Sequence, residues 1–457
     1  MKTQLLFLST LLFSFSISAQ IDFEAHIIVD SHPDALGPFT LISADIDDDG
    51  DKDILTNAYN ADKIIWFENL DGQGTFSEPR IITSNIDYPL DITVADINND
   101  GNLDVIAVFA LNDRVSWFEN IDGLGNFSQE ILIRNLPFSR TVEAKDIDGD
   151  GDIDIVAVND LKVIWLENMD GLGTFGPEKI VANYTYLTYS LNVNDLDADG
   201  DMDILMADHG RNTVTWYKNT DGQGTFGPEI IISSEAYYTN TAITSDIDKD
   251  GDLDVVSVSN ENYNSYVAWF ENTDGLGNFG TPNIIASNIN HVNKLFATDI
   301  DSDGDDDIIA TIPNIGRIIW LENDGVGNFG EQQFIYLNAL DPLDIIADDF
   351  NNDGKMDVAA SIFGSNQIIW FENKGPLSIE ENQTNHFSLY PNPTNGLLNI
   401  QSKTSIAEIT IFNNLGQLFL SAENKNQIDI STLSEGIYFV NIKDENGQTE
   451  TKKVLKK

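Results

Sequence analysis

The sequence predicts an all-β fold, in which a seven-bladed β-propeller is followed by a small C-terminal β-sandwich. Seven acidic loops of one pattern recur about fifty residues apart along the 457-residue chain, a spacing typical of propeller blades. Four short strands rich in β-branched and aromatic residues can be placed in each interval. The composition then changes after residue 375, where the acidic loops stop. Four strands in each unit of about fifty residues describe a blade.

Each loop has the pattern Asp-x-Asp-x-Asp-Gly-x-x-Asp, with Asn in place of the second Asp in the second and seventh copies. Oxygen-bearing side chains at positions 1, 3, 5 and 9, together with a backbone carbonyl at position 7, suit Ca²⁺ better than Mg²⁺. Glycine at position 6 supplies the sharp turn. A single copy could be an exposed acidic turn, but seven copies favour a metal site. Position 12 is not Glu and the flanks are strand-like, which excludes an EF-hand.

The predicted metal-loop residues occupy positions 1, 3, 5, 7 and 9 of each copy. They are Asp45, Asp47, Asp49, Asp51 and Asp53; Asp96, Asn98, Asp100, Asn102 and Asp104; Asp146, Asp148, Asp150, Asp152 and Asp154; Asp195, Asp197, Asp199, Asp201 and Asp203; Asp246, Asp248, Asp250, Asp252 and Asp254; Asp299, Asp301, Asp303, Asp305 and Asp307; Asp349, Asn351, Asp353, Lys355 and Asp357.

All seven tryptophans fall at one place in the repeat, in the middle of the third predicted strand. A tryptophan stripe can stack on sugars, but apolar surroundings favour packing between blades. The seventh unit lacks a fourth strand after residue 373, and residues 23–29 resemble the fourth strand of the first unit. We therefore expect this N-terminal segment to complete the last blade and close the ring.

These loops, and the Gly-x-Phe step that ends the blades, resemble the FG-GAP and VCBS repeats, which also build the propeller of integrin alpha subunits. The resemblance covers residues 22–374 of a predicted propeller at 20–374. It implies calcium in the loop between the first and second strands of each blade. It implies no adhesion partner, because a fold does not carry a function.

The two ends of the chain predict export. Residues 1–19 have the positive start and apolar core of a signal peptide, and no cysteine follows to carry a lipid anchor or a disulfide. After a predicted linker at 375–386, residues 387–457 resemble the type A sorting domain of the type IX secretion system, with its Tyr-Pro-Asn-Pro opening and basic tail. This resemblance implies handling by the type IX machinery and a secreted or cell-surface location, reached through the periplasm. The alternative for this segment is a carbohydrate-binding β-sandwich.

The formal net charge of −51 argues against nucleic acid or an anionic membrane as partner. We expect no integral membrane span once the signal peptide is removed. The acidity itself needs no partner, since the loops and solubility account for it.

The loops opposite the metal loops gather most of the arginines, with tyrosines and histidines. Such residues can stack on sugars and bind carboxylates or sulfates, although surface loops collect polar and aromatic residues in any protein. The predicted ligand face comprises Arg114, Arg140, Arg211, Arg317, Tyr88, Tyr186, Tyr238, His209 and His291.

No catalytic motif stands out, and we assign no catalytic residue. We expect a secreted or cell-surface calcium-binding propeller that acts as a binding or adhesion module, with a polysaccharide or a surface protein as candidate partner. The alternative is a polysaccharide-active enzyme of the lyase type that uses the loop-rich face. Convergence of a His or Tyr with an Arg in one cleft would favour the second.

Overall fold

The computed structural model describes residues 20–84, 86–159, 161–183, 187–261, 265–376, 387–402, 404–413, 417–446 and 449–457. These residues form strands and two 3₁₀ turns, η1 (Pro313–Ile315) and η2 (Phe363–Ser365). The chain divides into two compact units, residues 1–377 and 378–457. The predicted signal peptide at 1–19 lies outside the described residues. Within the described part of the chain, no helix is long and apolar enough to cross a membrane.

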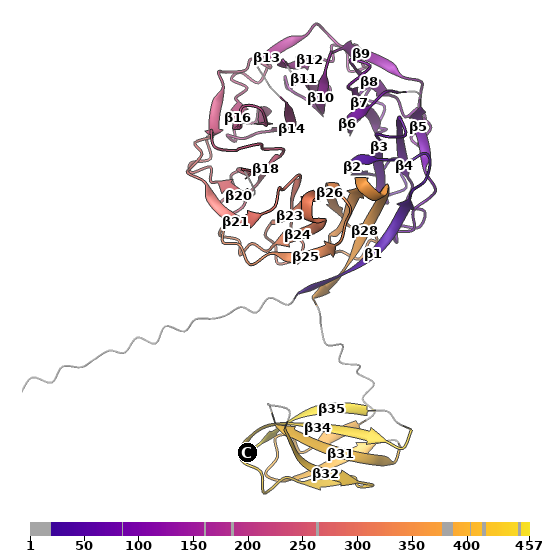
Figure 1. The fold of residues 1–457 in the computed structure, drawn as a ribbon, viewed down its shortest axis with the longest axis vertical. Helices are drawn as coiled ribbons and strands as arrows, with labels where there is room; N and C mark the ends of the chain where they lie inside the picture. The colour runs from indigo at the N-terminus through magenta and orange to yellow at the C-terminus, as the bar shows by residue number, and fades with distance from the viewer. Residues whose placement is uncertain are drawn as a thin grey trace, which may run out of the picture. The chain divides into compact units, whose positions relative to one another are not determined.

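The described residues of the first unit form seven four-stranded antiparallel sheets, or blades, arranged in a ring (Figure 1). This number equals that of the acidic loops. Blade 1 contains β2 (Pro38–Ala44), β3 (Asp53–Ala58), β4 (Lys63–Phe67) and β5 (Arg80–Ser84); blade 2 contains β6 (Pro89–Ala95), β7 (Asp104–Phe109), β8 (Arg114–Phe118) and β9 (Ile131–Asn135); blade 3 contains β10 (Ser139–Lys145), β11 (Asp154–Asn159), β12 (Lys162–Leu166) and β13 (Lys179–Asn183).

The remaining blades repeat this order, with the first strand of each at the centre of the ring. Blade 4 contains β14 (Thr188–Asn194), β15 (Asp203–Asp208), β16 (Thr213–Tyr217) and β17 (Ile230–Ser233); blade 5 contains β18 (Ala242–Ser245), β19 (Asp254–Ser259), β20 (Ser265–Phe270) and β21 (Asn283–Ile289); blade 6 contains β22 (Leu295–Thr298), β23 (Asp307–Ile312), β24 (Arg317–Leu321) and β25 (Gln333–Leu337); blade 7 contains β26 (Pro342–Asp348), β27 (Asp357–Ile362), β28 (Gln367–Pro376) and β1 (Ile21–Asp30).

The N-terminal strand completes blade 7, which confirms the prediction for residues 23–29. Strand β1 pairs antiparallel with β28 (Figure 1). In this pairing His26 lies opposite Trp370. The predicted linker starts too early at 375, because β28 extends to Pro376, which pairs with the buried Ile21. Gly375 also donates its N–H to the side-chain oxygen of Asn373 at 2.9 Å. The rest of the predicted linker, residues 377–386, lies outside the described residues.

The blades pack through their tryptophans, as the apolar surroundings predict. Each of the seven is at most 5 % exposed. The ring of Trp66 in blade 1 covers Gly125 in blade 2 so closely that a Cβ on this glycine would lie 2.2 Å from Cζ2. Trp370 of blade 7 covers Gly74 of blade 1 in the same way. The tryptophans are therefore part of the contact between blades.

The second unit consists of two antiparallel sheets with one shared core. Side chains of both sheets, such as Leu398 and Val440, belong to the same buried cluster. One sheet has the order β29 (Phe387–Tyr390), β30 (Leu397–Ser402), β33 (Gln427–Asp429), and the other the order β32 (Leu418–Glu423), β31 (Ile406–Asn413), β34 (Gly436–Asp444), β35 (Thr449–Lys456).

Candidate metal loops and candidate ligand site

Each acidic loop joins the first and second strands of its blade. Its turn is held by hydrogen bonds from backbone N–H groups to the loop's own carboxylates. In loop 1 the carboxylate of Asp45 accepts the N–H groups of Asp49 at 3.1 Å and Gly50 at 3.0 Å. Gly50 has a φ of 94°, which a residue with a Cβ rarely adopts. The same bonds from positions 5 and 6 to position 1 recur in loop 2. The backbone thus turns the alternate carboxylates toward one centre.

The aspartate at position 9, at the end of each loop, is buried. Asp53 has no exposed surface and accepts the N–H of Ile46 at 3.0 Å and that of Asn69 at 2.8 Å. Burial raises the pKa of its carboxyl to about 7, although both hydrogen bonds oppose this shift. The pKa of Asp307 is raised to about 8 by the same cause. The position 9 aspartates of the other five loops show the same shift, to about 7: Asp104, Asp154, Asp203, Asp254 and Asp357.

The oxygens of these loops fit a hard cation. Asp45, Asp47 and Asp53 each offer one oxygen, and the three atoms lie within 4.8 Å of one another. Further groups of this kind occur in loop 3 and loop 4. Buried carboxylate oxygens without a hydrogen-bond partner are found in the described loops, on Asp47, Asp148, Asp197 and Asp246. Unpaired carboxylates packed together are costly without a counter-ion, and carboxylate oxygens are the ligands that Ca²⁺ prefers.

In three loops the side chain at position 7 contacts the neighbouring blade. Asp152 of loop 3 accepts a hydrogen bond from Asn99 of loop 2 at 2.8 Å, and Asp51 of loop 1 accepts one from Asn352 of loop 7 at 2.9 Å. Lys249 of loop 5 pairs with Asp305 of loop 6 at 2.8 Å. At these interfaces position 4 of one loop binds position 7 of the next. The backbone carbonyl of position 7 is therefore the group left for a metal.

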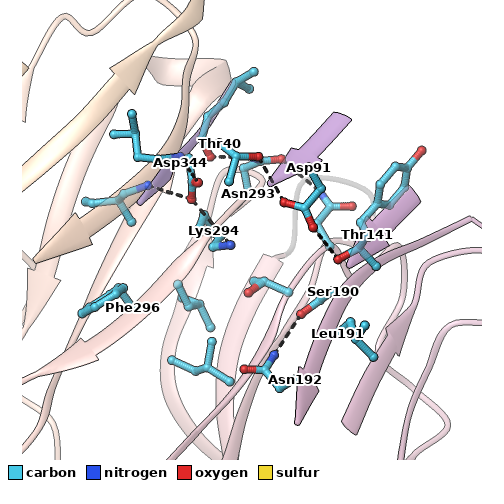
Figure 2. Close-up of a pocket in the computed structure, with 18 of the residues that line it drawn as sticks. Thr40, Asp91, Thr141, Ser190, Leu191, Asn192, Asn293, Lys294, Phe296 and Asp344 are labelled. Carbon is cyan, nitrogen blue, oxygen red and sulfur yellow. Dashed lines mark hydrogen bonds and ion pairs between the residues drawn. The ribbon is translucent and has the colours of Figure 1, made fainter. Parts of the chain in front are cut away.

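A second candidate site is the cavity at the centre of the ring, with a volume of about 790 Å³. The innermost strand of each blade lines it, as Figure 2 shows for several residues. Asp91 accepts hydrogen bonds from Thr40 at 3.3 Å and Thr141 at 2.6 Å. Lys294 lies 3.5 Å from Asp344, which raises the pKa of the ammonium. The cavity thus holds charged groups of both signs.

Aromatic and cationic side chains converge at the loop-rich mouth of this cavity. The guanidinium of Arg140 lies over the ring of Tyr189, 5.6 Å from its centroid. The ring of His209 lies 5.5 Å from that of Tyr189 and 5.4 Å from that of Tyr238. His209 and His291 both line the cavity. Burial lowers the pKa of His209, and the charge of His291 lowers it further, which favours a neutral imidazole.

The other predicted ligand residues are not brought to this mouth. Arg114 binds Glu130 with two hydrogen bonds, and Arg211 binds Glu229 in the same way at 2.6 and 2.9 Å. Arg317 lies over Phe334, 5.1 Å from the ring centroid. These arginines stand at or just before the third strand of their blades, away from the axis, and only Arg140 is on a first strand. The four arginines therefore do not form one rim.

Two predicted tyrosines also stand apart from the cavity lining. Tyr88 packs edge-on against Tyr59, with ring centroids 4.8 Å apart. Tyr186 lies outside the described residues.

Sequence reasoning missed the charged groups inside the cavity, Asp91, Glu143 and Lys294, which line it beside Asp344. Asp91 and Glu143 are acidic residues on first strands, and Lys294 directly precedes one; these charges were the signal in the sequence.

The geometry defines a class of proteins: β-propellers with an acidic loop, suited to a cation, between the first two strands of the blades. The family model of the FG-GAP-like repeat matches residues 45–107, 146–206, 195–257, 246–310 and 299–360. The chain therefore belongs to the FG-GAP-like repeat family. A second model, the secretion system C-terminal sorting domain, matches residues 388–457. This is the sorting domain of the type IX machinery, so the protein is exported and is secreted or attached at the cell surface.

Solved structures show the same fold at low identity. An Agrocybe aegerita lectin, described as recognising non-reducing terminal N-acetylglucosamine, has a TM-score of 0.52 and 23 % identity over 74 % of this chain and 86 % of its own. The BBS1N protein in complex with ARL6DN has a TM-score of 0.51 and 12 % identity over 76 % and 96 %. Kuenenia stuttgartiensis hydrazine synthase has a TM-score of 0.51 and 11 % identity over 74 % and 96 %. No curated protein matches the chain.

Proposed function

We propose that the protein is a calcium-stabilised binding module at the cell surface, and that it holds a polysaccharide at the loop-rich mouth of the central cavity. The observation that carries this proposal is the contact series Arg140, Tyr189, His209 and Tyr238. The residues come from the first strands and loops of neighbouring blades. A ring-shaped fold thus presents them together at one opening.

The chemistry of this series suits a sugar chain that carries an acidic group. Tyr189 is 46 % exposed and Tyr238 is 50 % exposed, so both rings offer a face or edge to a pyranose. The guanidinium of Arg140 can bind a carboxylate or sulfate. Nδ1 of His209 is buried without a hydrogen-bond partner among the described residues. The similarity of fold to a lectin is in keeping with a sugar ligand.

Calcium is the second part of the proposal, and it serves stability and not ligand contact. The loops lie at the end of the first strands opposite to the cavity mouth, because they join the end of each first strand to the second. Metal bound only by the folded state stabilises it by mass action. When bound, calcium supplies a positive charge that offsets the packed carboxylates of the loop that holds it.

A glycan array probed with the full chain in calcium tests the ligand site, followed by calorimetry on the strongest acidic glycan. Arg140→Ala and Tyr189→Ala should each weaken binding by about tenfold or more, which corresponds to about 1.4 kcal/mol. Arg317→Ala and Tyr390→Ala are matched controls, since Arg317 stacks on Phe334 away from the cavity and Tyr390 belongs to the second unit. Unchanged binding by the Arg140→Ala/Tyr189→Ala double variant would rule out this site.

One observation favours a lyase as the second candidate function. Arg140, Tyr189 and His209 lie in direct succession at one opening, where an arginine could bind a uronate carboxylate and a tyrosine or neutral histidine could remove the adjacent proton. Incubation of the chain with uronate polysaccharides should then produce unsaturated uronate ends, which absorb in the ultraviolet. Binding without such products would leave the module as a binder.

A further inference from the structure

The residue two positions after each tryptophan distinguishes blade 4 from the other six. It follows the third strand and precedes the asparagine that reaches the neighbouring blade. In six blades this residue is glutamate, whereas blade 4 has Lys218. The glutamates are Glu68, Glu119, Glu167, Glu271, Glu322 and Glu372.

The glutamate lies against the acidic loop of its own blade. In blade 1 an oxygen of Glu68 lies within 4.8 Å of oxygens of Asp47 and Asp49, at positions 3 and 5. In blade 2 Glu119 accepts a hydrogen bond from Asn98, at position 3, at 3.3 Å. The position lies beside the loop, where a glutamate can add one more carboxylate oxygen to the group that a cation would bind. In blades 1, 3 and 7 this glutamate also pairs with a basic side chain, Glu68 with Arg80, Glu167 with Lys179 and Glu372 with Lys374.

Lys218 places an ammonium where the other blades have this carboxylate. Its Nζ contacts Oδ2 of Asp197 and lies 2.9 Å from Oδ2 of Asp199. These are positions 3 and 5 of loop 4, and Asp197 is only 3 % exposed. The loop therefore has a covalently attached counter-ion that already binds two of its predicted metal ligands.

A calcium ion in loop 4 would have to share these carboxylates with the ammonium. Oδ1 of Asp197 has no hydrogen-bond partner among the residues that the structure describes, but a divalent ion bound to it would lie beside a positive charge in a partly buried site. The reversal from glutamate to lysine also removes one oxygen ligand. Charge and ligand number thus both disfavour a metal in this loop.

We infer that Lys218 replaces the metal ion in loop 4. Its ammonium then holds the carboxylates of this loop together without calcium, whereas the loops of the six blades with a glutamate bind calcium. The inference deepens the proposed function, because it rests on calcium binding by the other loops. Blade 4 is then the blade whose acidic loop keeps a counter-ion at positions 3 and 5, the ammonium of Lys218, when calcium is removed.

Loop 7 shows that a nearby lysine alone does not create this arrangement. Nζ of Lys355 lies 2.6 Å from Oδ2 of Asp353, at position 5 of the same loop. Lys355 is at position 7, where side chains of other loops contact the neighbouring blade. Glu372 remains at the position that Lys218 occupies in blade 4. We therefore assign loop 7 to the calcium-binding group.

Native mass spectrometry of the full chain in calcium tests the inference, because it counts bound ions. The parent chain should hold six, and Lys218→Glu should hold one more. Glu167→Lys, which transfers the lysine to blade 3, should hold one fewer. Asp150→Asn in loop 3 should also lose one ion, whereas Asp199→Asn at the same position of loop 4 should leave the number unchanged.

Melting after chelation supplies a second measurement for variants that fold poorly. Lys218→Glu should widen the difference in melting temperature between calcium and chelator, since it adds a metal-dependent loop. Seven ions on the parent chain, or no gain with Lys218→Glu, would overturn the role of Lys218 and leave the proposed calcium function standing. A parent chain that binds no calcium would overturn both.

Discussion

The side chain of Asn69 donates a hydrogen bond through Nδ2 to the carbonyl oxygen of Phe350 at 2.8 Å. This bond joins blade 1 to the acidic loop of blade 7. The side-chain oxygen of Asn69 accepts the N–H of Gly74 at 3.1 Å, so one buried amide links a turn to a neighbouring loop. The other six interfaces have the equivalent bond, from Asn120 to Ile46, Asn168 to Ile97, Asn219 to Ile147, Asn272 to Leu196, Asn323 to Ile247 and Asn373 to Ile300.

Asn69→Ala should lower the free energy of unfolding by about 1 to 3 kcal/mol, because it leaves buried backbone groups without a partner. Urea unfolding followed by tryptophan fluorescence measures the change. Asn126→Ala is the control, since the Asn126 amide binds Asp122 on an exposed turn and should cost little. Equal losses in the two variants would contradict the role of the buried bond.

Gly125→Ala should destabilise the propeller more than Gly149→Ala. Both glycines have a positive φ, of 76° and 73°. A Cβ at Gly125 would lie 2.2 Å from Trp66, whereas the nearest atom at Gly149 would be 3.6 Å away. Overpacking adds roughly 1 to 3 kcal/mol to the backbone cost that both share. Thermal melting compares the two variants. Equal decreases in melting temperature would mean that Trp66 moves aside without loss of stability.

Removal of metal should lower the melting temperature markedly, and calcium should restore it better than magnesium. The packed carboxylates of each loop repel one another without a cation, and each site in hundredfold excess of calcium contributes about 2.7 kcal/mol. Calorimetry in chelator, then in each metal, measures both effects. A melting curve that does not respond to chelator or to either metal would refute a structural role for calcium.

Glu143→Gln should stabilise the propeller at alkaline pH and not at acidic pH. Burial in the central cavity, with the charge of Asp91, raises the pKa of Glu143 to about 7, while Lys145 and Lys294 oppose the shift. The unfolded pKa is roughly 4.3, so deprotonation costs nothing near pH 4 and its full penalty above pH 7. Each pKa unit corresponds to about 1.4 kcal/mol, which predicts a gain on the order of 1 to 3 kcal/mol at pH 8. Unfolding of parent and variant at pH 4.5 and pH 8 in constant calcium checks the sign.

Deletion of residues 387–457 should leave the propeller intact and prevent its delivery outside the cell. The second unit is a separate compact unit with its own core, which includes Phe387, Ile409 and Val440. The melting temperature of the first unit should be unchanged, and cell fractionation should find it in the periplasm. Normal surface display of the shortened chain would refute the sorting role of this segment.

The sequence was informative wherever one pattern recurs. The repeated loops predicted the blades, and residues 23–29 were recognisable as the missing strand because they resemble another fourth strand. The arginines do not recur at one place in the repeat. Arg114 and Arg317 begin third strands, and the third strand of a blade lies farther from the axis of the ring than the first. The ion pair between Arg114 and Glu130 joins residues on different strands, and no local sequence pattern predicts it. The sequence shows Lys218 as the one lysine at a position that is otherwise glutamate. Only the structure shows that its ammonium binds Asp197 and Asp199 of the acidic loop.

The pairing of β1 with β28 places the seam of the ring between the two ends of the domain. During synthesis the first strand to emerge has no partner until the last repeat has been made, and long-range pairing of this kind is slow. The ring therefore cannot close until the whole propeller has been made. Truncation at either end of the propeller would leave an unpaired strand edge, which can pair with a neighbouring molecule.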